Sequence, residues 1–140
     1  MYLVRLLYAS KVMAGFTPAD LQSVLEAARR RNVKKGISGL LAFNGDYFLQ
    51  VLEGGREAVN RLYQSIACDG RHEDILLLQL SEVSERMFPR WSMAYVPTAM
   101  LSRDLLMSFS CNGQFVPLKM GASSCLGLLQ ALRECLPSSE

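Results

Sequence analysis

Residues 36–54 read GISGLLAFNGDYFLQVLEG, with an apolar run on each side of Asn44-Gly45. Asn and Gly both accept positive φ at little cost, so this dipeptide between apolar runs predicts a β-hairpin. Its strands are expected at residues 37–43 and 47–52. The second strand carries a primary amide, Gln50, and a buried polar group without a partner costs about 1–3 kcal/mol. Either Gln50 faces water, or the protein provides a buried hydrogen-bond partner for its amide.

Composition predicts a globular, intracellular protein. The chain has 140 residues, of which 50% are hydrophobic and 20% are charged, and its net charge of +2 gives no strong attraction to nucleic acid or anionic lipid. The four cysteines show no close-paired spacing, so we expect reduced thiols and neither a disulfide framework nor a metal site. We find no signal peptide and no run long enough to span a membrane, and we predict a cytoplasmic location without membrane contact.

The N-terminal part predicts a strand followed by a helix. Residues 3–10 form an apolar run that is too short for a helix. Thr17 is the expected N-cap of the helix and Pro18 suits its first turn. Asn32 stands where we expect the helix to stop.

The rest of the chain completes an α+β fold. A second helix is expected over residues 57–68, a central strand over 75–80 and a short fifth strand over 91–96. The order β-α-β-β-α-β-β predicts a ferredoxin-like α/β sandwich, in which the first and third strands lie side by side in the middle of the sheet. Strand alternation then places Tyr8 and Gln50 on the face covered by the two helices.

The opposite face of the predicted sheet is also apolar and needs a cover. Residues 101–109 and 123–136 predict two C-terminal helices that pack there, on this chain or on a partner. We therefore divide the chain into residues 1–97 and a helical extension, residues 98–140, and a homo-oligomer through the sheet or the extension is one expectation.

Sets of catalytic residues are poorly represented. His72 is the single histidine, and no serine or cysteine motif accompanies it, so we interpret it as a surface or loop residue. The basic run at residues 29–35 is explained by a helix C-terminus, which favours positive charge. The adjacent aromatics Tyr47 and Phe48 point to opposite faces and do not form an RNA-stacking surface, so we expect no nucleic-acid partner.

Three polar residues converge in the predicted fold. Tyr8, Asn32 and Gln50 each have an ordinary explanation alone, as a core phenol, a helix cap and a core amide. Together they point to one region between the helices and the sheet. Two amides that each offer a donor and an acceptor suit a flat heterocycle with alternating carbonyl and N–H groups.

The chain resembles the BLUF family, the sensors of blue light using FAD. The resemblance covers residues 1–97, and the tail without a recognisable output domain is similar to the short stand-alone members. The motifs are Tyr8-Ala9-Ser10, Arg31-Asn32 before residues 36–41, residues 48–54 (FLQVLEG), Arg71-His72, and Phe88 with Trp91-Ser92-Met93.

The resemblance implies a non-covalently bound FAD whose ring lies between the two helices. Asn32 would bind the pyrimidine edge, and Gln50 would lie beside N5 and the C4 carbonyl with Tyr8 bonded to its amide. Other implied contacts are Ile37 and Met93 near the ring, and Arg30, Asp69 and Arg71 near the ribityl-phosphate chain.

The implied function is a photoreceptor and not an enzyme. Light would rearrange the hydrogen bonds among Tyr8, Gln50 and the flavin, by rotation or tautomerisation of the amide, and give a reversible red-shifted state. Trp91 and Met93, expected on one face of the fifth strand, would relay this state to a downstream protein of unknown identity. The alternatives are a small acyl-phosphate hydrolase, for which residues 9–15 lack a glycine-rich phosphate loop, and an RNA-binding module.

Overall fold

The computed structural model describes residues 2–137, which form five strands and four α-helices. The elements follow the predicted order, β-α-β-β-α-β-β and then two helices, and two short 3₁₀ turns, Thr98–Met100 and Pro117–Lys119, lie in the C-terminal part. The strands are β1 (Leu3–Val12), β2 (Ser38–Phe43), β3 (Tyr47–Gly55), β4 (His72–Glu82) and β5 (Ala94–Val96). The helices are α1 (Pro18–Lys35), α2 (Arg56–Ala67), α3 (Arg103–Met107) and α4 (Ala122–Arg133).

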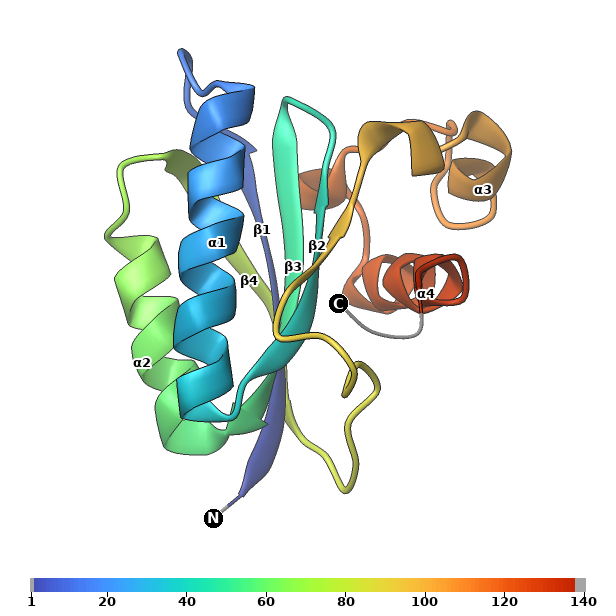
Figure 1. Ribbon diagram of the computed structural model, residues 1–140. Helices are drawn as coiled ribbons and strands as arrows, with labels where there is room; N and C mark the ends of the chain where they lie inside the picture. The colour runs from blue at the N-terminus through green and yellow to red at the C-terminus, as the bar shows by residue number, and fades with distance from the viewer. Residues whose placement is uncertain (1, 138–140) are drawn as a thin grey trace.

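The strands form one mixed sheet in the order β4-β1-β3-β2-β5, with helices on both sides (Figure 1). β1 and β3 pair antiparallel at its centre, and this register sets Tyr8 opposite Gln50. α1 and α2 cover one face, and α3 and α4 lie on the other side. The predicted ferredoxin-like arrangement, with two C-terminal helices on the second face, is confirmed.

Helix α1 begins with a capping box. The Thr17 hydroxyl accepts a hydrogen bond from the Asp20 amide at 3.1 Å, and the Asp20 carboxylate accepts one from the Thr17 amide at 2.8 Å. The helix ends at Gly36, whose φ of 67° is left-handed. The prediction that Asn32 ends the helix is wrong: the helix runs on to Lys35, and Asn32 lies on its buried face.

The Asn-Gly turn forms as predicted. The Asn44 side-chain oxygen accepts hydrogen bonds from the amides of Asp46 and Tyr47, at 3.0 and 2.9 Å, and Gly45 adopts a φ of 94°. The side chain of Asn44 thus closes the loop, while the glycine supplies the left-handed residue.

The sheet separates two hydrophobic cores, and each core lies between one face of the sheet and the helices that cover that face. The core beneath α1 and α2 includes Tyr8, Leu25, Ile37, Leu41, Phe48, Leu52, Val59 and Met93. The core beneath α4 includes Leu7, Leu40, Leu49, Val51, Trp91, Leu128 and Leu129. The cover over the second apolar face therefore comes from this chain's own helices.

The prediction that residues 75–80 form a central strand is wrong, because β4 lies at an edge of the sheet. Leu76, Leu77 and Leu80 are 45%, 42% and 55% exposed, although Leu78 packs against the core beneath α4. A continuous apolar run is usual for a strand buried on both faces. Here the same pattern belongs to a strand that leaves three leucines at the surface.

The fifth strand is shorter than predicted. Only Ala94–Val96 pair with β2, in parallel, and residues 91–93 form an irregular bend. Because strand alternation does not apply to a bend, Trp91 and Met93 do not share a face, contrary to the sequence prediction. Met93 lies in the core beneath α1 and α2, and Trp91 in the core beneath α4. We call residues 83–93, which connect β4 to β5, the crossing segment.

Candidate functional site: a groove between two helices and the sheet

Tyr8, Gln50 and Met93 form a chain of buried contacts at the centre of the sheet. The Tyr8 hydroxyl donates a hydrogen bond to Gln50 Oε1. Gln50 Nε2 donates in turn to Met93 Sδ at 3.2 Å. Gln50 is 6% exposed, and Tyr8 and Met93 are at most 2% exposed. Both ends of the amide are therefore satisfied within the chain, one by a phenol and the other by a thioether, which is a weak acceptor.

Burial raises the pKa of Tyr8 well above its ordinary value of 10.0, and the nearby Tyr63 raises it further. The phenol is therefore neutral throughout the physiological pH range and keeps the proton that it donates to Gln50. This proton is available for transfer along an existing hydrogen bond.

His72 lies at the start of β4, beside Tyr8 and Phe48. Its Nδ1 is 2.8 Å from the hydroxyl of the buried Ser10, and its ring centroid is 4.9 Å from that of Phe48. The prediction of a surface or loop residue is wrong, since the His72 ring is half-buried against the central strands. Burial lowers its pKa, although Asp69 acts in the opposite direction, so the neutral imidazole is favoured.

Two cavities follow the groove between α1 and α2, and Arg31 borders both. The inner cavity, of about 90 Å³, reaches the sheet, and the outer cavity, of about 360 Å³, opens toward solvent. The inner cavity is lined by Tyr8, Phe16, Val24, Ala27, Ala28, Arg31, Leu41, Phe48, Gln50, Ile66, Asp69, Arg71 and His72. The outer cavity is lined by Arg31, Lys35, Ile37, Glu57, Ala58, Arg61, Leu62 and Ser65.

Asn32 connects α1 to the crossing segment. Its Nδ2 donates to the Ser92 carbonyl at 2.7 Å, and its Oδ1 accepts from Arg31 Nε at 3.2 Å. One turn earlier, Arg29 Nε donates to the Met93 carbonyl at 3.0 Å. The buried amide of Asn32 therefore holds the backbone that precedes β5, on the same side of the sheet as Gln50.

Asp69 and Arg71 form a bidentate pair at the border of the inner cavity. Arg71 Nε lies 3.0 Å from Asp69 Oδ1, and its terminal nitrogen lies 2.9 Å from Oδ2. The hydrogen bonds from Arg71 lower the pKa of the Asp69 carboxyl, and the same pair raises the pKa of Arg71. A fixed guanidinium therefore faces the cavity next to the neutral His72.

The other sequence-predicted residues lie at different distances from the groove. Ile37 borders the outer cavity, whereas Arg30 is exposed on α1 and Arg31 takes the position beside both cavities. Trp91 lies on the far side of the sheet, where its indole Nε1 donates to the Pro137 carbonyl at 3.2 Å. The structure thus gathers Tyr8, Gln50 and Met93 in one place and separates Trp91 from them.

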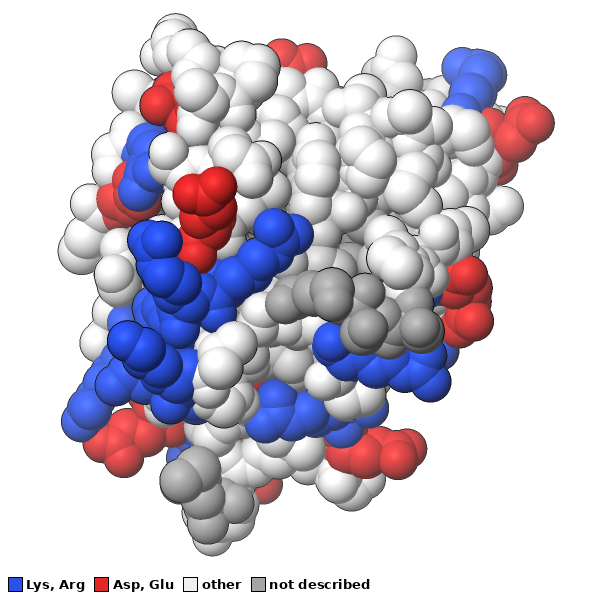
Figure 2. Space-filling model, in the orientation of Figure 1, with Lys and Arg blue, Asp and Glu red and all other residues white. Residues whose placement is uncertain are grey.

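The electrostatics of the groove change along its length. Lys and Arg gather over the C-terminal half of α1 (Figure 2). The inner cavity combines apolar walls with Tyr8 and Gln50 at the sheet and with charged side chains at its border, and the outer cavity carries three cations, Arg31, Lys35 and Arg61, and one acid, Glu57. This arrangement suits a flat, largely apolar ring inside and negatively charged groups outside.

Comparison with known proteins identifies the family. The family model described as "Sensors of blue-light using FAD" matches residues 3–94. The chain belongs to the BLUF family. The match contains β1 to β4, the crossing segment and the first residue of β5, and the family model describes a sensor of blue light.

Solved BLUF structures match nearly the whole chain. The photo-activated state of BlsA has a TM-score of 0.84 at 33% identity, and the match covers 94% of each chain. The dark state of BlrB has a TM-score of 0.78 at 32% identity, over 96% of this chain and 98% of BlrB. Both likenesses extend through the C-terminal helices, which lie beyond the family model.

Larger relatives contain the same unit as a part. The photoactivated adenylate cyclase subunit beta of Euglena longa is 32% identical over 125 residues, which cover 82% of this chain. The chain spans only 14% of the length of that protein. The likeness therefore concerns one part of a much longer protein.

The residues of this BLUF protein fit FAD, the cofactor of the family. Gln50 offers an amide at the floor of the inner cavity, Leu41 and Phe48 offer apolar surface, and Arg31 and Lys35 offer positive charge on the way out. Taken together, the inner and outer cavities reach the size of an ordinary cofactor site, about 300–1,000 Å³.

Sequence reasoning missed His72 and undervalued Arg31. His72 directly precedes the apolar run of β4, and Arg31 directly precedes Asn32. Both belong to the motifs quoted for the resemblance, Arg31-Asn32 and Arg71-His72, and this membership was the available signal. Among the described residues 2–137, no helix is long and apolar enough to cross a membrane, and no group of side chains is arranged to hold a metal ion.

Proposed function

We propose that this BLUF protein converts absorption of blue light into a new arrangement of the Gln50 amide, which Met93 passes to a partner protein. The observation that carries the proposal is the continuous contact from the Tyr8 hydroxyl through both ends of the Gln50 amide to Met93 Sδ. A single rearranged amide would change the bonding of both neighbours at once.

Bound FAD supplies light absorption and, once excited, an oxidant strong enough to take an electron from a phenol. Tyr8 is buried and neutral, and its proton already points at Gln50 Oε1. Tyr8 would give its electron to the flavin and its proton to the hydrogen bond with Gln50, and both would return to it. After their return Tyr8 is again a neutral phenol, and only the arrangement of the Gln50 amide differs.

Either rearrangement of Gln50 weakens its bond to Met93. Rotation of the amide exchanges the Nε2 donor for Oε1, and the thioether sulfur has no proton to donate to an oxygen. Tautomerisation removes one of the two protons from Nε2. Arg29 still donates to the Met93 backbone carbonyl, while the weakened contact with Gln50 lets the Met93 side chain change its packing.

The relay continues through the crossing segment. Asn32 holds the Ser92 carbonyl on the groove side, and Trp91 contacts Pro137 on the far side. A change at Met93 therefore has a short covalent path to Trp91 and to the chain beyond α4. We propose Met93 as the residue next to the flavin and Trp91 as the residue that reports to the second layer.

We also propose which other residues contact FAD. Ile37 walls the groove, Asp69 and Arg71 border its inner end, and Asn32 turns its amide to the flavin ring if the bond to Ser92 gives way. Of the two arginines, Arg31 is a better candidate than Arg30 for the ribityl-phosphate chain, because it borders both cavities.

The organisation of the chain supports an output by binding. We propose residues 1–97 as the FAD-binding unit and residues 98–140 as its cap, with a downstream protein as the receiver of the signal and no reaction of its own. The four free thiols suit the reducing cytoplasm. The exposed leucines of β4 offer a surface for a homo-oligomer, which gel filtration in darkness and in light would detect.

An absorption spectrum of the flavin-loaded protein before and after blue light tests the proposal. We expect a small red shift that recovers in darkness, and no shift in Tyr8→Phe, which keeps the flavin but has no hydroxyl. Tyr63→Phe is the matched control, because the Tyr63 ring centroid lies 5.8 Å from that of Tyr8. A protein that takes up no FAD, or a Tyr8→Phe protein that shifts normally, would contradict the proposal.

A further inference from the structure

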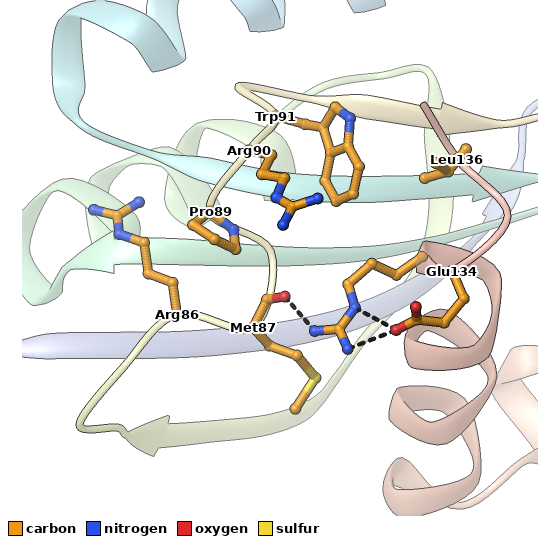
Figure 3. A pocket seen from close by; sticks show the side chains of 8 residues that line it. Arg86, Met87, Pro89, Arg90, Trp91, Glu134 and Leu136 are labelled. Carbon is orange, nitrogen blue, oxygen red and sulfur yellow. Dashed lines mark hydrogen bonds and ion pairs between the residues drawn. The ribbon is translucent and has the colours of Figure 1, made fainter. Parts of the chain in front are cut away.

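A third cavity lies away from the flavin groove, between the crossing segment and the C-terminal end of α4 (Figure 3). Its volume of about 390 Å³ is within the range of ordinary binding sites. We call it the arginine pocket. It is lined by Arg86, Met87, Pro89, Arg90, Trp91, Arg133, Glu134 and Leu136.

Three arginines and one glutamate give the arginine pocket a positive charge. Arg133 is already engaged, since it donates to the Met87 carbonyl at 2.7 Å and pairs with Glu134 at 2.9 Å. Arg86 is engaged as well, with Ser38 Oγ at 2.8 Å and the Gly36 carbonyl at 2.7 Å. Arg133 and Arg86 therefore form part of the pocket walls, and their guanidinium groups already have partners within the chain.

Arg90 differs from its neighbours. It is exposed, and within residues 2–137 its guanidinium makes no hydrogen bond or ion pair. Figure 3 shows the Arg90 side chain beside Trp91 and Pro89, and the Arg86 side chain pointing away from it. Among the described residues, Arg90 therefore presents an unpaired guanidinium at the arginine pocket, and a carboxylate of another molecule is the group that such a guanidinium binds.

The remaining walls decide which kind of anion fits. Pro89, Met87 and Leu136 give an apolar floor. Trp91 is only 4% exposed, so its ring faces are not open to stack on a base, and its indole N–H is already bonded to Pro137. A nucleotide or a single-stranded nucleic acid would lack the stacking surface on which such recognition depends.

We propose that the arginine pocket docks an acidic peptide segment of the partner protein. A carboxylate of the segment pairs with Arg90, and an apolar side chain beside that carboxylate packs on Pro89 and Leu136. Arg133 and Arg86 keep their present bonds and add long-range attraction.

The light dependence of this docking rests on the proposed function of Gln50 and Met93. One wall of the pocket is the crossing segment, which leads within a few residues from Arg90 to Met93. Glu53 of β3 fixes the middle of that segment through the amides of Met87 and Phe88, at 2.8 and 2.7 Å. A change at Met93 therefore shifts Arg90 and Trp91 relative to residues 87–88, which Glu53 holds in place. The affinity for the acidic peptide segment then differs between darkness and light.

Selection of random peptides on phage, with the immobilised flavin-loaded protein as the target, tests the proposal. We expect the enriched peptides to share an Asp or Glu next to an apolar residue and to bind more weakly as salt is raised. Enrichment of neutral or basic peptides, or no enrichment, would overturn the proposal. So would a single-stranded RNA that binds more tightly than the selected peptides through Arg90.

Charge-reversal variants locate the binding. We expect Arg90→Glu to weaken the selected peptides by about tenfold or more, and Arg90→Gln to have a smaller effect. Arg103→Glu, an exposed arginine at the start of α3, is the matched control and leaves the affinity unchanged. Equal binding to wild type and to Arg90→Glu would show that the peptides dock elsewhere.

Spectra of the same samples separate the two proposals. A normal red shift with no Arg90-dependent peptide binding overturns the docking site alone. A missing red shift with Arg90-dependent binding leaves the docking site standing and overturns the function proposed for Gln50. A normal red shift with equal affinity in darkness and light overturns the coupling between them.

Discussion

Glu53 is a carboxylate with no exposed surface, three residues after Gln50 on β3. Arg5 Nε donates to it at 2.7 Å, and the amides of Met87 and Phe88 donate at 2.8 and 2.7 Å. A buried charge is tolerated only when such partners compensate for lost hydration. The sequence offered a hint, because Glu53 is the one acid in a strand whose other residues, apart from Gln50, are mostly apolar, but its three donors come from segments distant in the sequence.

Replacing Glu53 with Gln leaves the positive charge of Arg5 without its partner and sets the amide N–H₂ against one of the two backbone donors, because Met87 and Phe88 bind different oxygens of the carboxylate. We expect a loss of about 3 kcal/mol in the free energy of unfolding, measured by denaturant titration of the flavin-loaded protein. Glu82→Gln is the control, since the pair of Glu82 with Arg56 is exposed and should cost less than about 1 kcal/mol. Equal losses in the two variants would deny Glu53 its role as an anchor.

His72 should make stability depend on pH. Burial lowers its pKa below the ordinary 6.5, so the unfolded chain takes up a proton at a pH where the folded chain does not. Folding then releases a proton, and stability falls as the pH drops below about 6.5. Denaturant titrations from pH 7 to pH 5 should show a smaller decline in His72→Gln. The pairing with Arg71 lowers the pKa of Asp69, which titrates at more acidic pH. Identical declines would mean that His72 is as accessible to protons in the folded state as in the unfolded one.

At the scale of elements, β2 and β3 approach closely at Gly39. A Cβ added there would collide with the Val51 carbonyl oxygen and would lie 3.3 Å from Met93 Cε. The first neighbour is backbone and cannot rotate away, so the strand itself would have to move. The glycine therefore allows β2 to sit against β3 while Met93 reaches Gln50.

We expect Gly39→Ala to lower the free energy of unfolding by about 1–3 kcal/mol, because overpacking forces backbone shifts. The same variant should also alter the red shift, since it displaces Met93. Gly70→Ala is the control, because a Cβ at Gly70 meets nothing within 4 Å, and it should stay within about 0.5 kcal/mol of wild type. Thermal unfolding and absorption spectra of both variants measure the two effects, and a Gly39→Ala protein with wild-type values in both would show that the strands can separate freely.

Local sequence patterns predict some of these elements and fail for others. The hairpin at Asn44-Gly45 and the N-cap at Thr17 are local features, and the sequence predicts both. The edge position of β4 is decided by which strands pair, and an apolar run does not carry that information. The bend at residues 91–93 depends on hydrogen bonds from Arg29 and Asn32 on another element, so the alternation rule failed there and Trp91 was assigned to the wrong face. The fold was thus predictable from pattern, whereas the contacts of Met93 and His72 required the assembled sheet.

At the scale of the whole molecule, the sheet is shared by two cores that carry different optical signals. Trp91, the single tryptophan, lies in the core beneath α4, and the flavin groove lies on the other side. Because every central strand contributes to both cores, we expect both sides to unfold together. Denaturant titration followed by tryptophan and by flavin fluorescence should give one common midpoint.

Leu129→Ala tests that coupling. Leu129 lies on the buried face of α4 and has no exposed surface, so its truncation should cost about 2–5 kcal/mol and lower both midpoints equally. An earlier transition in the tryptophan signal alone would show that residues 98–137 melt as a separate cap.

The crossing segment joins β4 and β5, which are the two opposite edges of the sheet. Because the crossing segment has a fixed length and connects the two edge strands, its path depends on the twist of the three strands between them. Glu53 holds the segment near its middle. The position of Met93 therefore depends on the twist of the whole sheet. We expect the rate of thermal recovery of the dark state to depend on that twist as well as on the chemistry of the Gln50 amide.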